Sequence, residues 1–264
     1  MKKNRHTIFH KTLLLFAGII FAPCVVIIVP LVIFNDWVFG RYRGWNYNFI
    51  IFKRVFDYTY FWSGIKMRTL FETPHDRKKK YVFVFNHIAY LDIMAALTTV
   101  RQPMRILAKT GPDKVPIFGY YYRKSTVLVD RSSTTSRGKS IDRLKHYLEN
   151  GISIMIYPEG TFNMGNSPLK SFYDGAFRIA IETQTNIKPV ILPDTFDRMN
   201  HNGLSLEPGK CRAVYLEEVS VQGLTVNDVE QLKTKVYNMM DDALRRYRAS
   251  WIEDSKPAGE AAAV

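Results

Sequence analysis

The segment YVFVFNHIAYLD, residues 81–92, carries the pattern on which the predicted fold depends. Its first five residues are β-branched or aromatic, which is typical of a buried strand, and a helix is expected to follow soon after Asn86. His87 stands at this junction, and Asp92 follows five residues later. Reactive side chains are commonly displayed where a strand ends and a helix begins, so the junction is the first candidate for a functional site.

Short apolar runs recur after this segment and alternate with stretches of helical periodicity. Apolar residues at Ile141, Leu144 and Leu148 predict one helix, and another is expected from about Asp228 to Arg248. Because strands and helices alternate, we predict an α/β fold with a largely parallel sheet flanked by helices. The expected strands are residues 81–85, 105–108, 126–129, 152–157, 188–192 and 211–217.

Near the N-terminus the sequence has a long uncharged segment. The 24 residues between Lys11 and Asp36 contain no charged side chain. As a helix they would extend about 36 Å at ~1.5 Å per residue, enough to cross a hydrocarbon core of roughly 30 Å. Pro23 and Pro30 leave open a second form, a bent hairpin that enters only one leaflet.

Positive charge is concentrated in the same region. Residues 1–80 hold 14 Lys and Arg against 4 Asp and Glu, a net of +10, whereas residues 81–264 hold 23 against 20, a net of +3. Basic residues beside an apolar anchor are typical of proteins on anionic membranes, while nucleic-acid-binding proteins more often spread them over the folded domain. The aromatic-rich residues 45–67 predict an interfacial amphipathic helix.

A polar connector, Thr-Pro-His-Asp-Arg-Lys-Lys-Lys at residues 73–80, separates this region from the alternating pattern. We therefore expect three parts. Residues 1–72 would form apolar and amphipathic helices that anchor the chain in a membrane, and residues 73–254 would form the α/β domain. Residues 255–264 would be a disordered tail.

His87 and Asp92 can act together only in one geometry. Five residues along a helix turn by about 140°, so the two side chains would not share a helix face. If His87 precedes the helix and its ring folds back over the first turn, Asp92 can accept the Nδ1 proton and leave Nε2 free to take a proton. The alternative is a capping asparagine before a solvent-facing histidine, and the spacing alone favours that alternative.

Other catalytic and structural devices have no counterpart in the sequence. Cys24 and Cys211 lie in no C-x-x-C or Cys/His cluster, so they predict neither a zinc site nor a disulfide framework. No G-x-S-x-G segment points to a serine nucleophile, and no phosphate-binding loop of the G-x-x-x-x-G-K type occurs.

Three more segments stand at matching positions. Pro158-Glu-Gly-Thr161 follows the strand 152–157, Ala108-Lys109 precedes Pro116-Ile-Phe-Gly119, and Asp130-Arg131 follows the strand 126–129. Together with Asn86-His87 and Asp92 they resemble the glycerolipid acyltransferase family, the 1-acylglycerol-3-phosphate acyltransferase-like enzymes with an HX4D motif. The resemblance extends over about residues 80 to 195 and includes Pro189-Val-Ile-Leu-Pro193.

This resemblance implies an enzyme of phospholipid biosynthesis. A fatty acyl group would pass from acyl-CoA or acyl carrier protein, the co-substrate, to the free hydroxyl of 1-acylglycerol-3-phosphate, without a metal or another cofactor. The family's location implies a cell (inner) membrane protein with its catalytic domain on the cytoplasmic face. The implied catalytic residues are His87 and Asp92, and the implied substrate-binding residues are Asn86, Lys109, Arg131, Glu159, Gly160 and Thr161.

Two positions depart from the family pattern. Phe162 stands where the family usually has an arginine after Glu-Gly-Thr, and Ser125 stands where it usually has a glycine. Another cation must then hold the acceptor phosphate, or the acceptor is a different lyso-lipid such as a lyso-amino-acid lipid. The candidate cations are Arg178, Lys170 and Arg131. A third hypothesis, of another class, is a non-catalytic membrane protein that binds anionic lipid through its basic N-terminal region.

Overall fold

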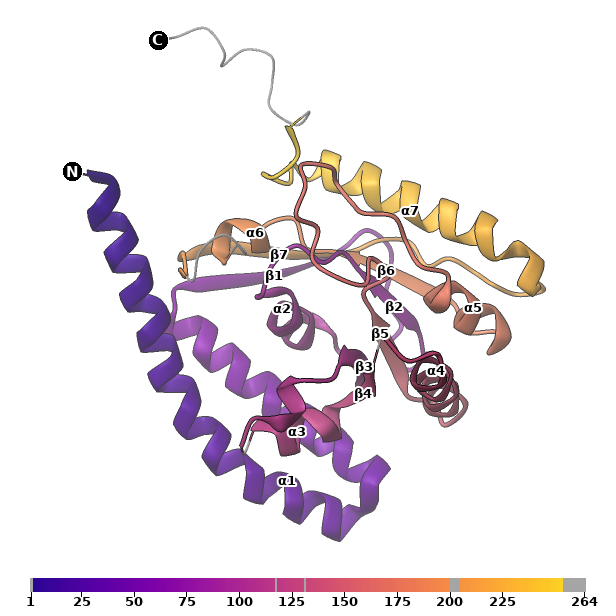
Figure 1. Ribbon diagram of the computed structural model, residues 1–264, viewed down its shortest axis with the longest axis horizontal. Coiled ribbons are helices and arrows are strands. Elements are labelled where there is room, and N and C mark those ends of the chain that lie inside the picture. Colours follow the sequence, from indigo (N-terminus) through magenta and orange to yellow (C-terminus); the bar gives the residue numbers. More distant parts are fainter. Residues whose placement is uncertain (1, 117, 131, 200–204, 254–264) are drawn as a thin grey trace, which may run out of the picture.

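A computed structural model describes residues 2–116, 118–130, 132–199 and 205–253 (Figure 1). The first element is helix α1, Lys2–Trp62. Its regular backbone is interrupted at Gly40, which has φ 73° and ψ 168°. Few residues other than glycine adopt such a positive φ, so the break falls there and not at Pro23 or Pro30. Figure 1 shows the two arms of α1 folded back on each other as a hairpin.

Contacts between the two arms hold this hairpin closed. The Phe21 ring stacks on Phe56 with centroids 5.7 Å apart, and the Asn35 side-chain amide donates to Asn48 Oδ1 at 2.9 Å. Within the described chain, residues 8–40 form one helix that is long and apolar enough to cross a membrane, by length and composition only.

Seven strands form a single sheet in the order β1-β7-β6-β2-β5-β3-β4. Neighbouring strands are parallel except for β6 and β7, which are antiparallel. The α/β fold with a largely parallel sheet is therefore confirmed. The strands are β1 Ile65–Phe71, β2 Val82–Phe85, β3 Met104–Lys109, β4 Thr126–Val129, β5 Ser153–Ile156, β6 Ile187–Ile191 and β7 Gly209–Tyr215.

Strand β1 corrects one sequence-based expectation. Residues 45–67 were expected to form one amphipathic helix, but α1 ends at Trp62 and β1 begins at Ile65. The strand pairs with β7 from Ile65 opposite Gly209 to Phe71 opposite Tyr215. The segment 1–72 therefore contains more than helices, because it also supplies the edge strand of the sheet.

Two layers of helices cover the sheet. Along β2, Val82 and Val84 face a core shared with α4, α5 and α7, while Phe83 and Phe85 face a core shared with α1 and α2. This alternation follows the two-residue period of a strand. The view in Figure 1 shows α4, α5 and α7 on one side and α1 to α3 on the other. The helices are α2 Asp92–Thr99, α3 Phe118–Ser125, α4 Thr134–Glu149, α5 Gly175–Glu182, α6 Thr195–Arg198 and α7 Val229–Arg246, with short 3-10 turns at Pro112–Lys114 and Val226–Asp228.

The parallel strands β2, β5, β3 and β4 are neighbours in the sheet, so their carboxyl ends meet at one edge. His87 follows β2 at this edge, Glu159 follows β5, and Lys109 is the last residue of β3. The fold thereby gathers segments that are far apart in sequence around one edge of the sheet.

Candidate active site

The His87 ring is bound to a buried carboxylate. His87 Nδ1 lies 2.9 Å from Asp92 Oδ2, and the same oxygen accepts hydrogen bonds from the backbone N–H groups of Ile88 at 2.7 Å and Ala89 at 2.9 Å. Asp92 is the first residue of α2 and is 0% exposed. His87 precedes the helix and its ring folds back over the first turn, which is the one geometry in which the two side chains can act together. A carboxylate at this position keeps the proton on Nδ1 and leaves the Nε2 lone pair available.

Two aromatic rings hold the imidazole in place. The Tyr157 ring stacks on His87 at 4.1 Å with an interplanar angle of 19°, and the Phe162 ring lies 4.2 Å away at 53°. Tyr90 contacts Phe162 edge-on at 5.0 Å. The His87 side chain remains 14% exposed. The ring is therefore packed against two aromatic side chains, while part of it stays open to a substrate.

Glu159 joins the segment after β5 to the backbone of His87. Its Oε1 accepts the His87 N–H at 2.7 Å, and its Oε2 accepts the Lys170 N–H at 2.9 Å. The Asn163 N–H donates to the His87 carbonyl at 2.7 Å, so both backbone polar groups of His87 are bound to this segment. Glu159 was expected to bind substrate, but the structure places it 1% exposed in a position that orients His87.

Burial raises the pKa of Glu159 to about 8 from an ordinary value of 4.5, although the two N–H donors oppose that shift. The folded protein then holds a proton that the unfolded chain releases, so the contribution of Glu159 to stability is greatest at low pH and is lost as pH rises through the folded-state value. We expect the free energy of unfolding to fall by on the order of a few kcal/mol between pH 5 and 8, since each pKa unit corresponds to ~1.4 kcal/mol.

Denaturant titrations at several pH values measure this fall. The Glu159→Gln variant should show a flatter pH dependence, while Glu149→Gln, a change at an exposed position on α4, should leave the slope of the wild-type protein unchanged. Equal slopes for wild type and Glu159→Gln would contradict the assignment.

Gly160 and Thr161 form the turn that follows. Gly160 has φ +72°, and a Cβ atom there would lie 2.7 Å from the Tyr173 ring, so the turn requires glycine. The Gly160 N–H donates to the Tyr157 carbonyl at 3.0 Å and is not available to an anion. Thr161 is exposed. Among the residues that the structure describes, the N–H groups of Thr161 and Phe162 have no acceptor, so they are the two backbone donors free at this turn.

The remaining predicted substrate-binding residues lie in three different settings. Asn86 is 1% exposed, and its Oδ1 accepts the Leu192 N–H at 2.7 Å, which ties the end of β2 to the end of β6. Lys109 is exposed at the end of β3, two strands from β2, which corresponds to about 10 Å along the sheet edge. Arg131 lies outside the described residues.

The structure also distinguishes the cations that could replace the missing arginine. Phe162, at that position, covers the His87 ring instead of presenting a charge. Arg178 is paired with Glu182 at 2.9 Å on the exposed side of α5. The positive charge of Lys170 opposes the rise in the pKa of Glu159. This lysine therefore lies near Glu159, beside the site.

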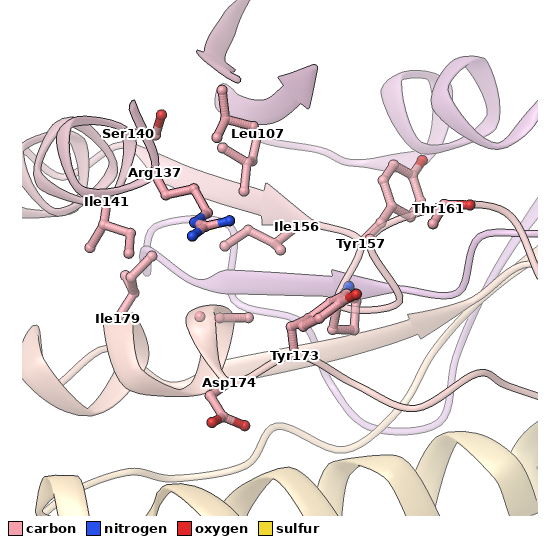
Figure 2. A pocket seen from close by; sticks show the side chains of 15 residues that line it. Leu107, Arg137, Ser140, Ile141, Ile156, Tyr157, Thr161, Tyr173, Asp174 and Ile179 are labelled. Carbon is pink, nitrogen blue, oxygen red and sulfur yellow. The ribbon is translucent and has the colours of Figure 1, made fainter. Parts of the chain in front are cut away.

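An apolar cavity of about 560 Å³ lies beside this loop, on the face of the sheet covered by α4 and α5. Ile141, Ile156 and Ile179 line it from α4, β5 and α5, and Figure 2 shows the Arg137 side chain extending among them. The lining also includes Gly160 and Thr161, so the cavity reaches the segment that holds His87.

Several of these contacts were not predicted from the sequence. Tyr157, Phe162 and Asn163 all touch His87, yet none was a candidate residue. The signal that could have found them is their position beside the Glu-Gly-Thr segment, because residues next to a turn in sequence share its neighbours in space. No group of three or more His, Cys, Asp or Glu residues that could hold a metal ion occurs in the described chain.

Fold and site together define an α/β protein with a histidine–aspartate pair at the carboxyl edge of a parallel sheet, next to an apolar cavity. A family model described as Acyltransferase matches residues 65–193, a range that begins at the first residue of β1. Over these residues the chain matches the acyltransferase family, as its motifs predicted.

Curated relatives and a solved structure agree with this assignment. A 1-acyl-sn-glycerol-3-phosphate acyltransferase of Haemophilus influenzae is 28% identical over 212 residues, which cover 75% of this chain and 86% of that protein. The Escherichia coli protein of the same name is 30% identical over 147 residues, 53% of this chain and 60% of that protein. The crystal structure of the 1-acyl-sn-glycerophosphate (LPA) acyltransferase PlsC from Thermotoga maritima has the same fold, with a TM-score of 0.74, 21% identity, and coverage of 95% of this chain and 99% of that one.

Proposed function

We propose that this protein transfers a fatty acyl group from acyl-CoA or acyl carrier protein to the free hydroxyl of 1-acylglycerol-3-phosphate and so produces phosphatidic acid. The observation that carries the proposal is the 2.9 Å contact between His87 Nδ1 and Asp92, with the opposite ring nitrogen facing away from the carboxylate at a partly open sheet edge. The relatives named for this activity supply the acceptor.

The geometry supports a direct transfer. Nε2 of His87 takes the proton of the acceptor hydroxyl, and the resulting alkoxide attacks the thioester carbonyl carbon. The negative charge on the carbonyl oxygen is stabilised by the free N–H groups of Thr161 and Phe162. The C–S bond then breaks, and His87 returns the proton to the leaving thiolate. Asp92 stabilises the imidazolium between these two proton transfers.

Positive charge for the acceptor phosphate would come from Lys170 and Lys109, and from Arg131, which lies outside the described residues. One observation favours a second acceptor class: Phe162 packs on His87 at the position where an arginine is usual for the family. An acceptor without a phosphate monoester, such as a lyso-amino-acid lipid, would lose less from that replacement. The chemistry at His87 would be the same.

The apolar cavity is the proposed place for the acyl chain, because it is lined by isoleucines and reaches Gly160 and Thr161. Filling it with Ile179→Trp should shorten the chain that fits. Losing room for two methylene groups costs ~1.6 kcal/mol, so we expect the kcat/KM ratio of long to short donors to fall about 10-fold. Competition between donors of different chain length measures this ratio.

Val226→Trp, a change of similar size at a position 51% exposed and outside the cavity, is the control and should leave the ratio unchanged. A variant at Ile179 that keeps the wild-type chain-length profile would place the acyl chain elsewhere.

The hairpin of α1 is the proposed membrane contact. Its exposed apolar side chains include Ile8, Leu15, Ile19, Ile27, Trp37 and Phe61. Tyr90 and Ile93, close to His87 in sequence, are also exposed, so apolar surface continues toward the site. We place the hairpin in the inner membrane of the cell and the catalytic domain on its cytoplasmic face, where acyl thioesters are made.

An assay on vesicles tests the function and the membrane contact together. The purified full chain is given radiolabelled acyl-CoA or acyl carrier protein and vesicles that contain one lyso-lipid at a time, and its sedimentation with the vesicles is measured. We expect labelled phosphatidic acid and co-sedimentation. Acylation of another lyso-lipid alone would replace the acceptor, and co-sedimentation without any product would favour a non-catalytic lipid-binding protein.

A further inference from the structure

The two carboxylate oxygens of Asp92 differ in their hydrogen bonding. Its Oδ2 accepts three hydrogen bonds, from His87 Nδ1 and from the N–H groups of Ile88 and Ala89. Its Oδ1 is buried and has no partner among the described residues, although Asp92 is 0% exposed. Buried polar atoms without a partner are rare, and one on the carboxylate that holds His87 calls for a physical explanation.

Two tyrosine hydroxyls near Asp92 are in the same condition. The hydroxyls of Tyr157 and Tyr60 are buried and have no partner in the described chain, and their residues are 9% and 4% exposed. Tyr157 follows β5 and stacks on His87, while Tyr60 lies in the second arm of the α1 hairpin. Tyr60 lines a cavity of about 270 Å³ together with Leu91, the residue that precedes Asp92.

The two hydroxyls also lie within electrostatic reach of Asp92. Burial is the main cause that raises the pKa of Tyr60 and of Tyr157, and the charge of Asp92 raises both further. Tyr60 in turn contributes to the shift at Tyr157. Both side chains therefore keep their protons and can donate. Tyr60 lines a cavity beside Leu91, and Tyr157 stacks on the ring that Asp92 binds. Three buried polar atoms without a partner, from α1, α2 and the end of β5, therefore lie around one carboxylate, where a water molecule with two to four partners is the usual solution.

We infer that Tyr60 and Tyr157 donate to one shared water molecule, which in turn donates to Oδ1 of Asp92. Under the proposed function, on which this inference rests, Tyr60 is a positioning residue that acts on His87 only through Asp92. The hairpin that contacts the membrane then also completes the hydrogen bonding of the catalytic pair. No described side chain donates directly to that oxygen.

A change in the rate's pH dependence distinguishes this role from packing. When the carboxylate loses a donor it keeps more negative charge, holds the imidazolium proton more tightly, and leaves less free base at low pH. The other titratable groups around the pair are Glu159, which binds the His87 backbone, Cys211 and Asp57, which act on Tyr60, and Lys170, which acts on Glu159. None of them is altered when one tyrosine hydroxyl is removed.

The test is the pH profile of kcat/KM for full-length Tyr60→Phe on lysophosphatidic acid vesicles. We expect the acid limb to move upward by roughly half a pH unit, which lowers the rate about 3-fold at pH values below the limb. Tyr58→Phe is the matched control, since Tyr58 is in the same arm and 49% exposed, and its profile should coincide with wild type. An unchanged acid limb for Tyr60→Phe, or an equal loss of rate at all pH values, would overturn the inference.

Failure of the proposed function gives a different result. If the wild-type protein acylates no lyso-lipid, the function fails, and electron density of the full chain then decides the inference. A water peak within hydrogen-bond distance of Asp92 Oδ1 and both hydroxyls supports it. Hydroxyls directed to other partners, or no peak between them in a map that shows other buried waters, would overturn it.

Discussion

Replacing His87 with alanine is expected to reduce acyl transfer about 10³-fold and to leave the protein folded. The variant loses Nε2, the atom proposed to take the acceptor proton, and general-base catalysis of this kind contributes ~10²–10⁴-fold. The fold should persist because the backbone of residue 87 keeps its bonds to Glu159 and Asn163. The measurement is kcat/KM on lysophosphatidic acid vesicles, with thermal unfolding followed in parallel.

The matched control is His146→Ala. His146 lies on α4 with its side chain 60% exposed, so this change removes an imidazole at a distance from the sheet edge. It should leave kcat/KM within about 2-fold of wild type, because surface changes of this kind have small effects. If His87→Ala lost no more activity than His146→Ala, another group would have to be the base.

Replacing Asp92 with asparagine is expected to lower kcat/KM by about 10²–10³-fold, because a neutral amide cannot stabilise the imidazolium of the proposed mechanism. The amide oxygen can still accept the N–H groups of Ile88 and Ala89, so the turn before α2 should keep its shape. The variant therefore separates the charge of the carboxylate from its hydrogen-bonding role. Steady-state kinetics of the variant on vesicles measures the effect.

Asp242→Asn removes the same charge at an exposed position on α7 and serves as the control. Activity of that variant should match wild type. An Asp92→Asn protein that retained half of the wild-type kcat/KM would mean that the imidazolium is stabilised by some other group, or that no imidazolium forms.

Much of the sheet could be predicted because its strands have local signals. Residues 81–85 alternate large and β-branched side chains, and the structure buries Phe83 and Val84 on opposite faces. Strand β1 had a shorter signal, the alternation of Ile65 and Met67 with the exposed Lys66 and Arg68, and the helix expected over residues 45–67 included its start. It becomes the edge strand of the sheet because β7, more than 130 residues later, pairs with it. A single sequence does not reveal such a distant partner.

The candidate site divides in the same way. The contact between His87 and Asp92 spans five residues, so local geometry was enough to predict it. Glu159 was assigned to substrate, whereas its carboxylate binds the backbone of His87, 72 residues away in sequence. That contact depends on the pairing of β2 with β5, which brings the ends of these two strands together. Asn86 likewise binds Leu192 only because β2 also pairs with β6.

The sequence by itself determined three features: the alternation of strands and helices, the uncharged N-terminal segment and the histidine–aspartate pair. Each of them involves residues that are close together in the sequence. Only the tertiary structure decided the bend of α1 at Gly40, the packing of Tyr157 and Phe162 on His87, and the placement of Tyr60 in a cavity beside Leu91. These features depend on which distant segments become neighbours. That choice is made by the burial of apolar faces over the whole sheet, and no short stretch of residues encodes it.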